Sequence, residues 1–318
     1  MRIVVLDAYT TNPGDISWQP LQDLGECVMY ERSTADQVLE RCRDAEIVLT
    51  NKTPLSKRHL DQLDRLQYIG MLSTGYDVVD IEAAARKNVP VTNVPGYATD
   101  SVAQMVLAHL LHFTQRAADH GQSVRQGGWS ARSDFCYWEY PLLELSGLNF
   151  GVLGLGRIGR RAAELARALG MRVLGHSFSG RKEPPAGVEL VELDTLLAES
   201  DVLSLHCRLS DESREIVNSG TLARMKPTAL LINTARGSLV REQDLADALN
   251  SGSLAGAGLD VLSREPPDSN NPLLTADNCL ITPHIGWATT AARQRLVHTV
   301  AENLRRYLQG DPVHVVNL

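Results

Sequence analysis

The sequence predicts an α/β protein with two doubly wound domains, each built on a parallel, Rossmann-like sheet. Short apolar runs rich in β-branched residues alternate along the 318 residues with segments whose apolar residues recur every three or four positions. This alternation is typical of parallel strands joined by crossover helices. Ten candidate strands are many for one open sheet, so two domains are the simpler interpretation. The candidate strands are Ile3–Leu6, Ile47–Thr50, Tyr68–Leu72, Val91–Asn93, Phe150–Leu153, Arg172–Leu174, Val202–Leu205, Ala229–Asn233, Ala257–Leu259 and Leu280–Thr282.

Two long helical runs mark the expected domain boundaries. The polar residues 99–101 are N-cap types, and we expect them to precede one continuous helix from Val102 to about Arg125. A second helical run extends from Thr289 to Leu308. We place the hinges at these helices, which makes the first domain discontinuous. The expected domains are a discontinuous one of residues 1–99 and 288–318 and an inserted one of residues 100–287.

Composition excludes several classes of protein. The formal charge of −7 disfavours a nucleic-acid binder, which needs a basic face to neutralise phosphates. The five cysteines are odd in number and form no CxxC pair, which favours free thiols in a reducing cytosol. No apolar stretch approaches the roughly 20 residues that cross a bilayer, and the N-terminus lacks a signal-peptide pattern. We therefore expect a cytoplasmic protein that binds neither membranes nor nucleic acids.

A glycine-rich turn indicates dinucleotide binding. Gly154, Gly156 and Gly159 form the pattern GxGxxG directly after a strand and directly before a helix. The first glycine permits a tight turn, the second lets the backbone approach a pyrophosphate, and the third allows close packing of helix and strand. The pyrophosphate would lie at the positive helix N-terminus. Residues 100–287 are then the expected dinucleotide-binding domain, and residues 1–99 and 288–318 the expected substrate-binding domain. The alternative is an ordinary glycine-rich turn.

The next strand tip bears on the choice between NAD and NADP. About 20 residues after the turn, an acidic residue usually binds the adenosine ribose. Here Ser177 occupies that tip, and Arg181 follows in the same loop. A hydroxyl group and cations accept a 2′-phosphate that a carboxylate would repel. We expect NADPH to be tolerated, although a solvated basic loop is the plainer interpretation.

Three residues after strands of the second domain have the chemistry of carbonyl reduction. These residues are Arg236, Glu265 and His284. Histidine titrates near neutrality and suits proton donation to a carbonyl oxygen. A carboxylate on its far ring nitrogen fixes the tautomer. An arginine fork binds a substrate carboxylate. Each residue taken alone is more often structural or part of a surface ion pair.

Together these motifs resemble the D-isomer-specific 2-hydroxyacid dehydrogenases over nearly the whole chain. Residues 73–80, 99–104 and 134–140 are most similar to the glycerate dehydrogenase/hydroxypyruvate reductase branch. The resemblance implies hydride transfer between NAD or NADP and a small 2-oxo or D-2-hydroxy acid, with hydroxypyruvate or glyoxylate as the expected oxo acid, and a homodimer joined through the middle domains. The alternatives are a dehydrogenase for bulkier 2-oxo acids and a non-catalytic, dinucleotide-sensing protein similar to a corepressor.

The resemblance also assigns roles to individual residues. Arg236 would bind the substrate, and Glu265 would pair with the acid/base His284. The implied cofactor residues are Gly154, Gly156, Arg157, Ile158, Gly159, Cys207, Thr234, Asp260 and Thr99, with Ser177 and Arg181 added from the loop argument above. The implied substrate-binding loop is Thr74, Gly75 and Tyr76.

Three further features have weaker support. Lys52 follows a strand of the first domain and either attracts an anionic substrate or is an ordinary surface lysine. The aromatic segment Phe135–Tyr140 either lines the active site, crosses a dimer interface or fills a core. The histidines on the helices lack the spacing of metal ligands, so we expect no metal site.

Overall fold

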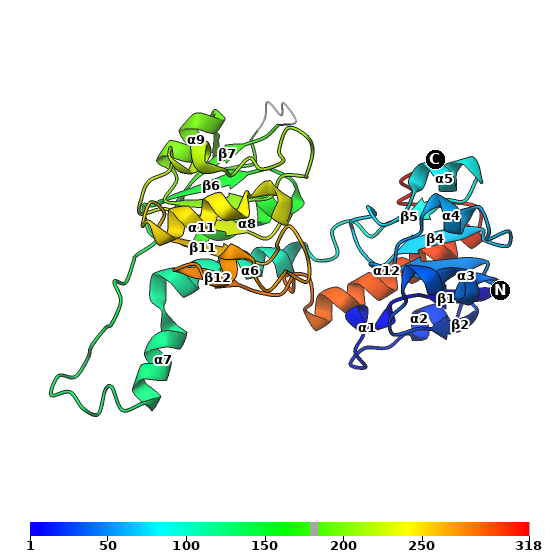
Figure 1. Ribbon diagram of the computed structural model, residues 1–318, viewed down its shortest axis with the longest axis horizontal. Helices are drawn as coiled ribbons and strands as arrows, with labels where there is room; N and C mark the ends of the chain where they lie inside the picture. Colours follow the sequence, from blue (N-terminus) through cyan, green and yellow to red (C-terminus); the bar gives the residue numbers. More distant parts are fainter. Residues whose placement is uncertain (179–183, 318) are drawn as a thin grey trace. The chain divides into compact units, whose positions relative to one another are not determined.

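The computed structural model describes residues 1–178 and 184–317, and the chain forms two compact units (Figure 1). Unit 1 comprises Met1–Ala98 and Trp287–Leu318, and unit 2 comprises Thr99–Gly286. These bounds differ by one residue from those expected from the sequence. Arg181 lies outside the described residues.

Unit 1 is built on a five-stranded parallel sheet in the order β2-β1-β3-β4-β5. The central strands are buried at every position, as expected for a parallel sheet covered on both faces. Its strands are β1 (Arg2–Val5), β2 (Glu26–Met29), β3 (Ile47–Thr50), β4 (Tyr68–Met71) and β5 (Val91–Thr92). Its helices are α1 (Ala8–Thr11), α2 (Gln19–Gln22), η1 (Ala35–Gln37), α3 (Val38–Cys42), α4 (Lys57–Leu60), α5 (Ile81–Arg86) and α12 (Thr290–Leu308).

Unit 2 is built on a seven-stranded parallel sheet in the order β12-β11-β10-β9-β6-β7-β8. Its strands are β6 (Asn149–Leu153), β7 (Arg172–His176), β8 (Val188–Leu190), β9 (Val202–Leu205), β10 (Leu230–Asn233), β11 (Gly256–Leu259) and β12 (Cys279–Ile281). Its helices are α6 (Thr99–Gln115), α7 (Ala117–Arg125), α8 (Arg157–Ala168), α9 (Leu193–Glu199), α10 (Ser219–Leu222), η2 (Gly237–Leu239), α11 (Glu242–Asn250) and η3 (Pro272–Leu274).

Successive residues of the unit 2 strands supply two separate cores. Val152 belongs to the cluster that includes Val106 and Leu110 of α6, whereas its neighbour Leu153 belongs to the cluster that includes Leu245 of α11. This period of two places the two clusters on opposite faces of the sheet. The predicted α/β class with two parallel sheets is therefore confirmed.

Two sequence-based expectations about elements were wrong. The strands β2 and β8 were not predicted, because they are short edge strands whose exposed positions interrupt the apolar run. The expected continuous helix from Val102 to Arg125 is two helices. It begins at Thr99, so the polar residues 99–101 form its first turn, and it breaks at Arg116, whose φ of +48° is left-handed.

The segment that follows the break stands away from the sheet of unit 2 (Figure 1). We call residues 117–142, which contain α7, the arm. The chain has returned to the body of unit 2 at Leu145, which is buried in the same cluster as Val106. The exposed apolar side chains of the arm include Trp129, Phe135, Trp138 and Leu142, and Phe135 is 89% exposed. The expectation that Phe135 fills a core within this chain is therefore wrong.

Within the described residues, none of the helices combines the length and the apolar character that a membrane span requires.

Candidate active site

The three predicted catalytic residues follow three adjacent strands of unit 2. Arg236 lies after β10, Glu265 after β11 and His284 after β12, and these strands are neighbours in the sheet. Parallel strands present their carboxyl ends at one edge, where ligands bind in open α/β sheets. The topology therefore assembles the three loops at this edge.

Glu265 and His284 form a direct pair. The Nδ1 atom of His284 lies 2.6 Å from Oε2 of Glu265, and each side chain is about one-third exposed. The other carboxylate oxygen, Oε1, accepts a hydrogen bond from the backbone N–H of Leu262 at 3.1 Å. Glu265 is thus held from one side by its own loop while it orients the imidazole on the other.

Gly237 brings the loop of Arg236 against the loop that leads to Glu265. A Cβ atom added to Gly237 would meet the carbonyl carbon of Leu262 at 1.9 Å and the amide nitrogen of Ser263 at 2.2 Å. Any other residue would force these backbones apart. This contact explains why a glycine directly follows the arginine.

Buried polar contacts fix the backbone that presents Arg236. The side chain of Asn233, which is fully buried, donates from Nδ2 to the carbonyl oxygen of Arg236 at 2.9 Å and accepts from the N–H of Ala235 at 3.0 Å. The guanidinium group of Arg236 is exposed, and within the described residues it donates to the carbonyl oxygen of Ala235 at 2.8 Å. Its fork therefore remains accessible to a ligand.

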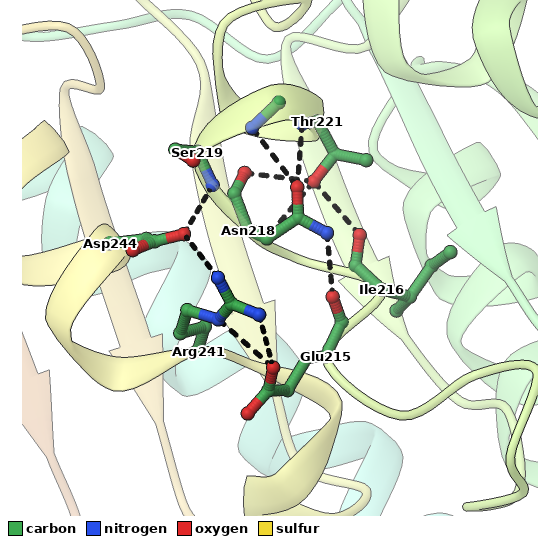
Figure 2. Close-up of polar contacts among 8 residues, drawn as sticks. Glu215, Ile216, Asn218, Ser219, Thr221, Arg241 and Asp244 are labelled. Atoms are coloured by element: carbon green, nitrogen blue, oxygen red, sulfur yellow. Dashed lines mark hydrogen bonds and ion pairs between the residues drawn. The ribbon is translucent and has the colours of Figure 1, made fainter.

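A second network anchors the chain just beyond this loop. Figure 2 shows Arg241 donating from Nε and Nη2 to one oxygen of Glu215, at 2.9 and 2.7 Å, while Asp244 accepts from the N–H of Ser219. The backbone N–H of Glu215 donates to the carbonyl oxygen of Ser238. These contacts join residues 215–219 to the segment that follows Arg236.

Asp260 clamps the loop of His284. Its carboxylate is 2% exposed and accepts from the hydroxyl of Thr282 at 2.5 Å and from the N–H groups of Ile285 and Gly286 at 2.9 and 2.7 Å. His284 has a φ of +53°, which is uncommon for a residue with a side chain. The surrounding contacts hold this conformation, as is frequent at functional sites.

The glycine-rich turn lies at the switch point of the same sheet, where β6 has β7 on one side and β9 on the other. Gly154 has a φ of +103°, and an added Cβ would meet the N atom of Cys207 at 2.4 Å. A Cβ on Gly159 would meet the carbonyl oxygen of Gly154 at 2.1 Å, whereas one on Gly156 would meet nothing within 4 Å. Two glycines are therefore required by packing, and the third leaves open space at the N-terminus of α8.

These features fit a bound dinucleotide. Gly156 is the N-cap of α8, and no side chain in the described residues caps this helix end. Arg157 and Ile158 form its first turn. The buried hydroxyl oxygen of Thr234 also has no hydrogen-bond partner in the described part of the chain. The turn and the strand ends thus offer donors without a protein partner.

The remaining candidates in unit 2 are placed as follows. Cys207 is buried, which raises the pKa of its thiol to about 11, so it is no thiolate nucleophile. Ser177 follows β7 directly, and Thr99 begins α6. His206, beside Cys207, bonds through Nε2 to the hydroxyl of Ser204 at 2.8 Å, and burial lowers its pKa to about 4.

The candidates in unit 1 lie at the carboxyl edge of its own sheet. The buried carboxylate of Asp7 accepts from the N–H groups of Asn51, Lys52 and Thr53 at 2.8, 2.5 and 2.8 Å, and the side chain of Lys52 is exposed. The loop of Thr74, Gly75 and Tyr76 follows the neighbouring strand β4. It is fixed by a hydrogen bond from the Thr74 hydroxyl to the carbonyl oxygen of Val94 at 2.7 Å.

Sequence reasoning missed the polar residues that support the site, namely Asn233, Thr282 and His109. His109 lies on α6 and touches Thr282, although 173 residues separate them. No local pattern identifies such a contact. Among the described residues, no group of three or more His, Cys, Asp or Glu side chains is arranged to hold a metal ion.

Comparisons with known proteins identify the family. Residues 107–286 match the family described as D-isomer specific 2-hydroxyacid dehydrogenase, NAD binding domain. The chain is 47% identical to the hydroxypyruvate reductase of Blautia hydrogenotrophica over all of both chains, and 38% identical to the glycerate dehydrogenase of Methylorubrum extorquens over 90% of each. A solved structure of an acyclic imino acid reductase in complex with NADPH and D-Arg has a TM-score of 0.87 and 29% identity, covering 99% of this chain and 100% of that one. The chain therefore belongs to the D-isomer-specific 2-hydroxyacid dehydrogenase family and is an oxidoreductase that uses NAD or NADP.

Proposed function

We propose that this enzyme reduces hydroxypyruvate to D-glycerate, with glyoxylate as a second substrate. The observation that carries the proposal is the pair of His284 Nδ1 and Glu265 Oε2 at 2.6 Å, beside the loop of Arg236. The identity of 47% to a hydroxypyruvate reductase over the whole chain supports the choice of substrate.

In this proposal His284 is the acid/base. Glu265 holds Nδ1–H, which leaves Nε2 to donate a proton to the carbonyl oxygen during reduction and to remove it during oxidation. When bound, the reduced nicotinamide supplies the hydride that adds to the carbonyl carbon. The Glu265 carboxylate also stabilises the imidazolium form that exists before the proton is given up.

Arg236 and two loops of unit 1 bind the substrate in this proposal. The guanidinium group of Arg236 polarises the carbonyl group and binds the carboxylate by its planar fork. The backbone N–H groups of Thr74, Gly75 and Tyr76 receive the carboxylate. Lys52, whose loop is fixed by Asp7, attracts the anion.

The glycine-rich turn binds the pyrophosphate, with Arg157 and Ile158 covering it, and Asp260 binds the nicotinamide with backbone groups of Cys207 and Thr234. Thr99 is also assigned to the cofactor. We propose that NADPH is accepted because Ser177, and not a carboxylate, follows β7. The KM values for NADH and NADPH test this point, and a strong preference for NADH would overturn it.

A panel of 2-oxo acids crossed with NADH and NADPH tests the function, with loss of reduced-cofactor absorbance as the readout. Hydroxypyruvate should give the highest kcat/KM, followed by glyoxylate. Faster turnover of bulkier 2-oxo acids would reassign the substrate. Cofactor binding without turnover of any acid would favour a dinucleotide-sensing protein.

We propose further that the enzyme is a homodimer joined through unit 2. The exposed aromatic side chains of the arm support this, because exposed apolar side chains gathered on a projecting segment are typical of an interface. Sedimentation should give twice the mass of the chain, and Phe135→Asp with Trp138→Asp should shift the equilibrium toward the monomer. A wild-type monomer would refute the proposal.

A cytoplasmic location is also proposed. All five cysteines, Cys27, Cys42, Cys136, Cys207 and Cys279, are unpaired thiols in the structure, as suits a reducing compartment.

A further inference from the structure

His109 is a buried titratable side chain that the mechanism above does not use. It lies on α6, which packs against β10 and β11, and it is 1% exposed. A Cβ added to Gly258 of β11 would meet the Cβ, Cγ and Nδ1 atoms of His109 at 2.7–2.8 Å. The glycine therefore provides the space in which the side chain of His109 packs against the strand.

The imidazole ring reaches the hydrogen bonds by which Asp260 holds the loop of His284. Its Nε2 atom lies 3.2 Å from the hydroxyl oxygen of Thr282, and that oxygen lies 2.5 Å from Oδ1 of Asp260. The sulfur of Met105 is a much weaker acceptor for the same hydroxyl, at 4.0 Å. The short contact with the carboxylate therefore decides where the hydroxyl proton points.

The number of hydrogens available for these contacts determines which ring nitrogen of His109 carries a proton. Thr282 has one hydroxyl hydrogen, and a carboxylate has none, so Thr282 must donate to Asp260. Its contact with His109 requires Nε2 to be the donor. A neutral imidazole has one N–H group, so Nδ1 carries a lone pair only.

The surroundings of Nδ1 agree with this tautomer. Nδ1 is buried and has no hydrogen-bond partner in the described residues. An imidazolium would bury a second N–H group there without an acceptor, which is costly. Burial lowers the pKa of His109, opposed by the charge of Asp260 and assisted by His112.

We propose that His109 is a positioning residue that holds Thr282 as a donor to Asp260 and thereby fixes the carboxylate for the nicotinamide. This inference rests on the proposed role of Asp260 in cofactor binding. A carboxylate accepts about four hydrogen bonds. Thr282, Ile285 and Gly286 supply three of them, which leaves one acceptor position, oriented by the other three, for the carboxamide N–H of the nicotinamide.

The first test is the tautomer of the wild-type apo enzyme, read from the ¹⁵N chemical shifts of His109 at neutral pH, with His109→Gln used to assign the signal. We expect a neutral ring with its proton on Nε2. A proton on Nδ1, or on both nitrogens, would overturn the proposal. This measurement does not depend on the substrate or on turnover.

The second test compares His109→Leu, which removes the donor, with His109→Gln, which keeps an N–H₂ group near the position of Nε2. Dissociation constants for NADH and NADPH are measured by fluorescence titration. We expect His109→Leu to weaken binding about fivefold, or about 1 kcal/mol, as suits one hydrogen bond, and His109→Gln to stay within about twofold of wild type. Equal weakening by both variants, or by neither, would contradict the role of the donor.

A ligand without nicotinamide provides the matched control. ADP-ribose, or its 2′-phosphate if NADPH is preferred, should bind His109→Leu as it binds wild type. Equal loss for this ligand would indicate general distortion and overturn the proposal. In a Thr282→Val background, His109→Leu should not weaken cofactor binding further. Additive effects of the two substitutions would refute the proposal that His109 acts on Asp260 through Thr282. Failure of wild type to bind NADH or NADPH would instead refute the proposed function.

Discussion

Replacing Gly156 by alanine separates cofactor binding from folding, because the three glycines of the turn have different surroundings. The added Cβ meets nothing within 4 Å, and the φ of −72° and ψ of −171° suit alanine. Loss of an N-cap glycine costs up to about 1 kcal/mol, and the less flexible unfolded chain offsets about 0.4–1 kcal/mol. We therefore expect a melting temperature within about 3 °C of wild type.

The same methyl group occupies the space that the proposed pyrophosphate needs. A displaced pyrophosphate loses contact with the N-terminus of α8, and we expect the Kd for NADH and NADPH to rise ten- to a hundredfold, or about 1.4–2.8 kcal/mol. Fluorescence titration measures the Kd, and calorimetry measures stability. Wild-type affinity in a folded Gly156→Ala variant would refute the assignment of the turn.

Gly159→Ala is the matched control, since its Cβ would meet a backbone oxygen at 2.1 Å. Overpacking of this kind costs about 1–3 kcal/mol or more, so the melting temperature should fall by on the order of 10 °C. If Gly156→Ala lost as much stability as Gly159→Ala, the distinction between the two glycines would be wrong.

Three other expectations follow from the site. His284→Asn should lower kcat by about 10²–10⁴-fold with little change in cofactor Kd, measured by steady-state kinetics and titration, and near-normal turnover would remove its role as acid/base. Arg236→Lys keeps the charge but loses the fork, so the KM for hydroxypyruvate should rise about tenfold or more, whereas an unchanged KM would contradict carboxylate binding there. The pKa of His206 falls from 6.5 to about 4 on folding, so its contribution to stability is complete above pH 6.5 and is lost as the pH falls toward 4. The full pKa shift corresponds to about 3 kcal/mol of unfolding free energy. Because His206 is only half-buried, we expect a loss of about 2 kcal/mol, measured by denaturant unfolding. A His206→Gln variant that loses as much stability between pH 6.5 and 4 as wild type would refute this.

The sequence alone was sufficient for the fold class, the glycine-rich turn and the placement of Arg236, Glu265 and His284 after strands of the second domain. These features depend on local patterns: apolar runs form buried strands, and glycine spacing marks a strand–helix turn. Residues at the carboxyl ends of parallel strands share one edge, whatever the details of packing. The family resemblance then joined motifs that are weak when taken singly.

Only the tertiary structure decided features that depend on residues distant in the chain. The edge strands β2 and β8 are stabilised by their neighbours, and the helix break at Arg116 releases an arm that no helical periodicity indicates. The chain from His109 through Thr282 to Asp260 joins residues far apart in the sequence. Periodicity reports which face of an element is buried, but the partner of a buried polar group is chosen by the packing of whole elements, and so it becomes visible only after the chain has folded.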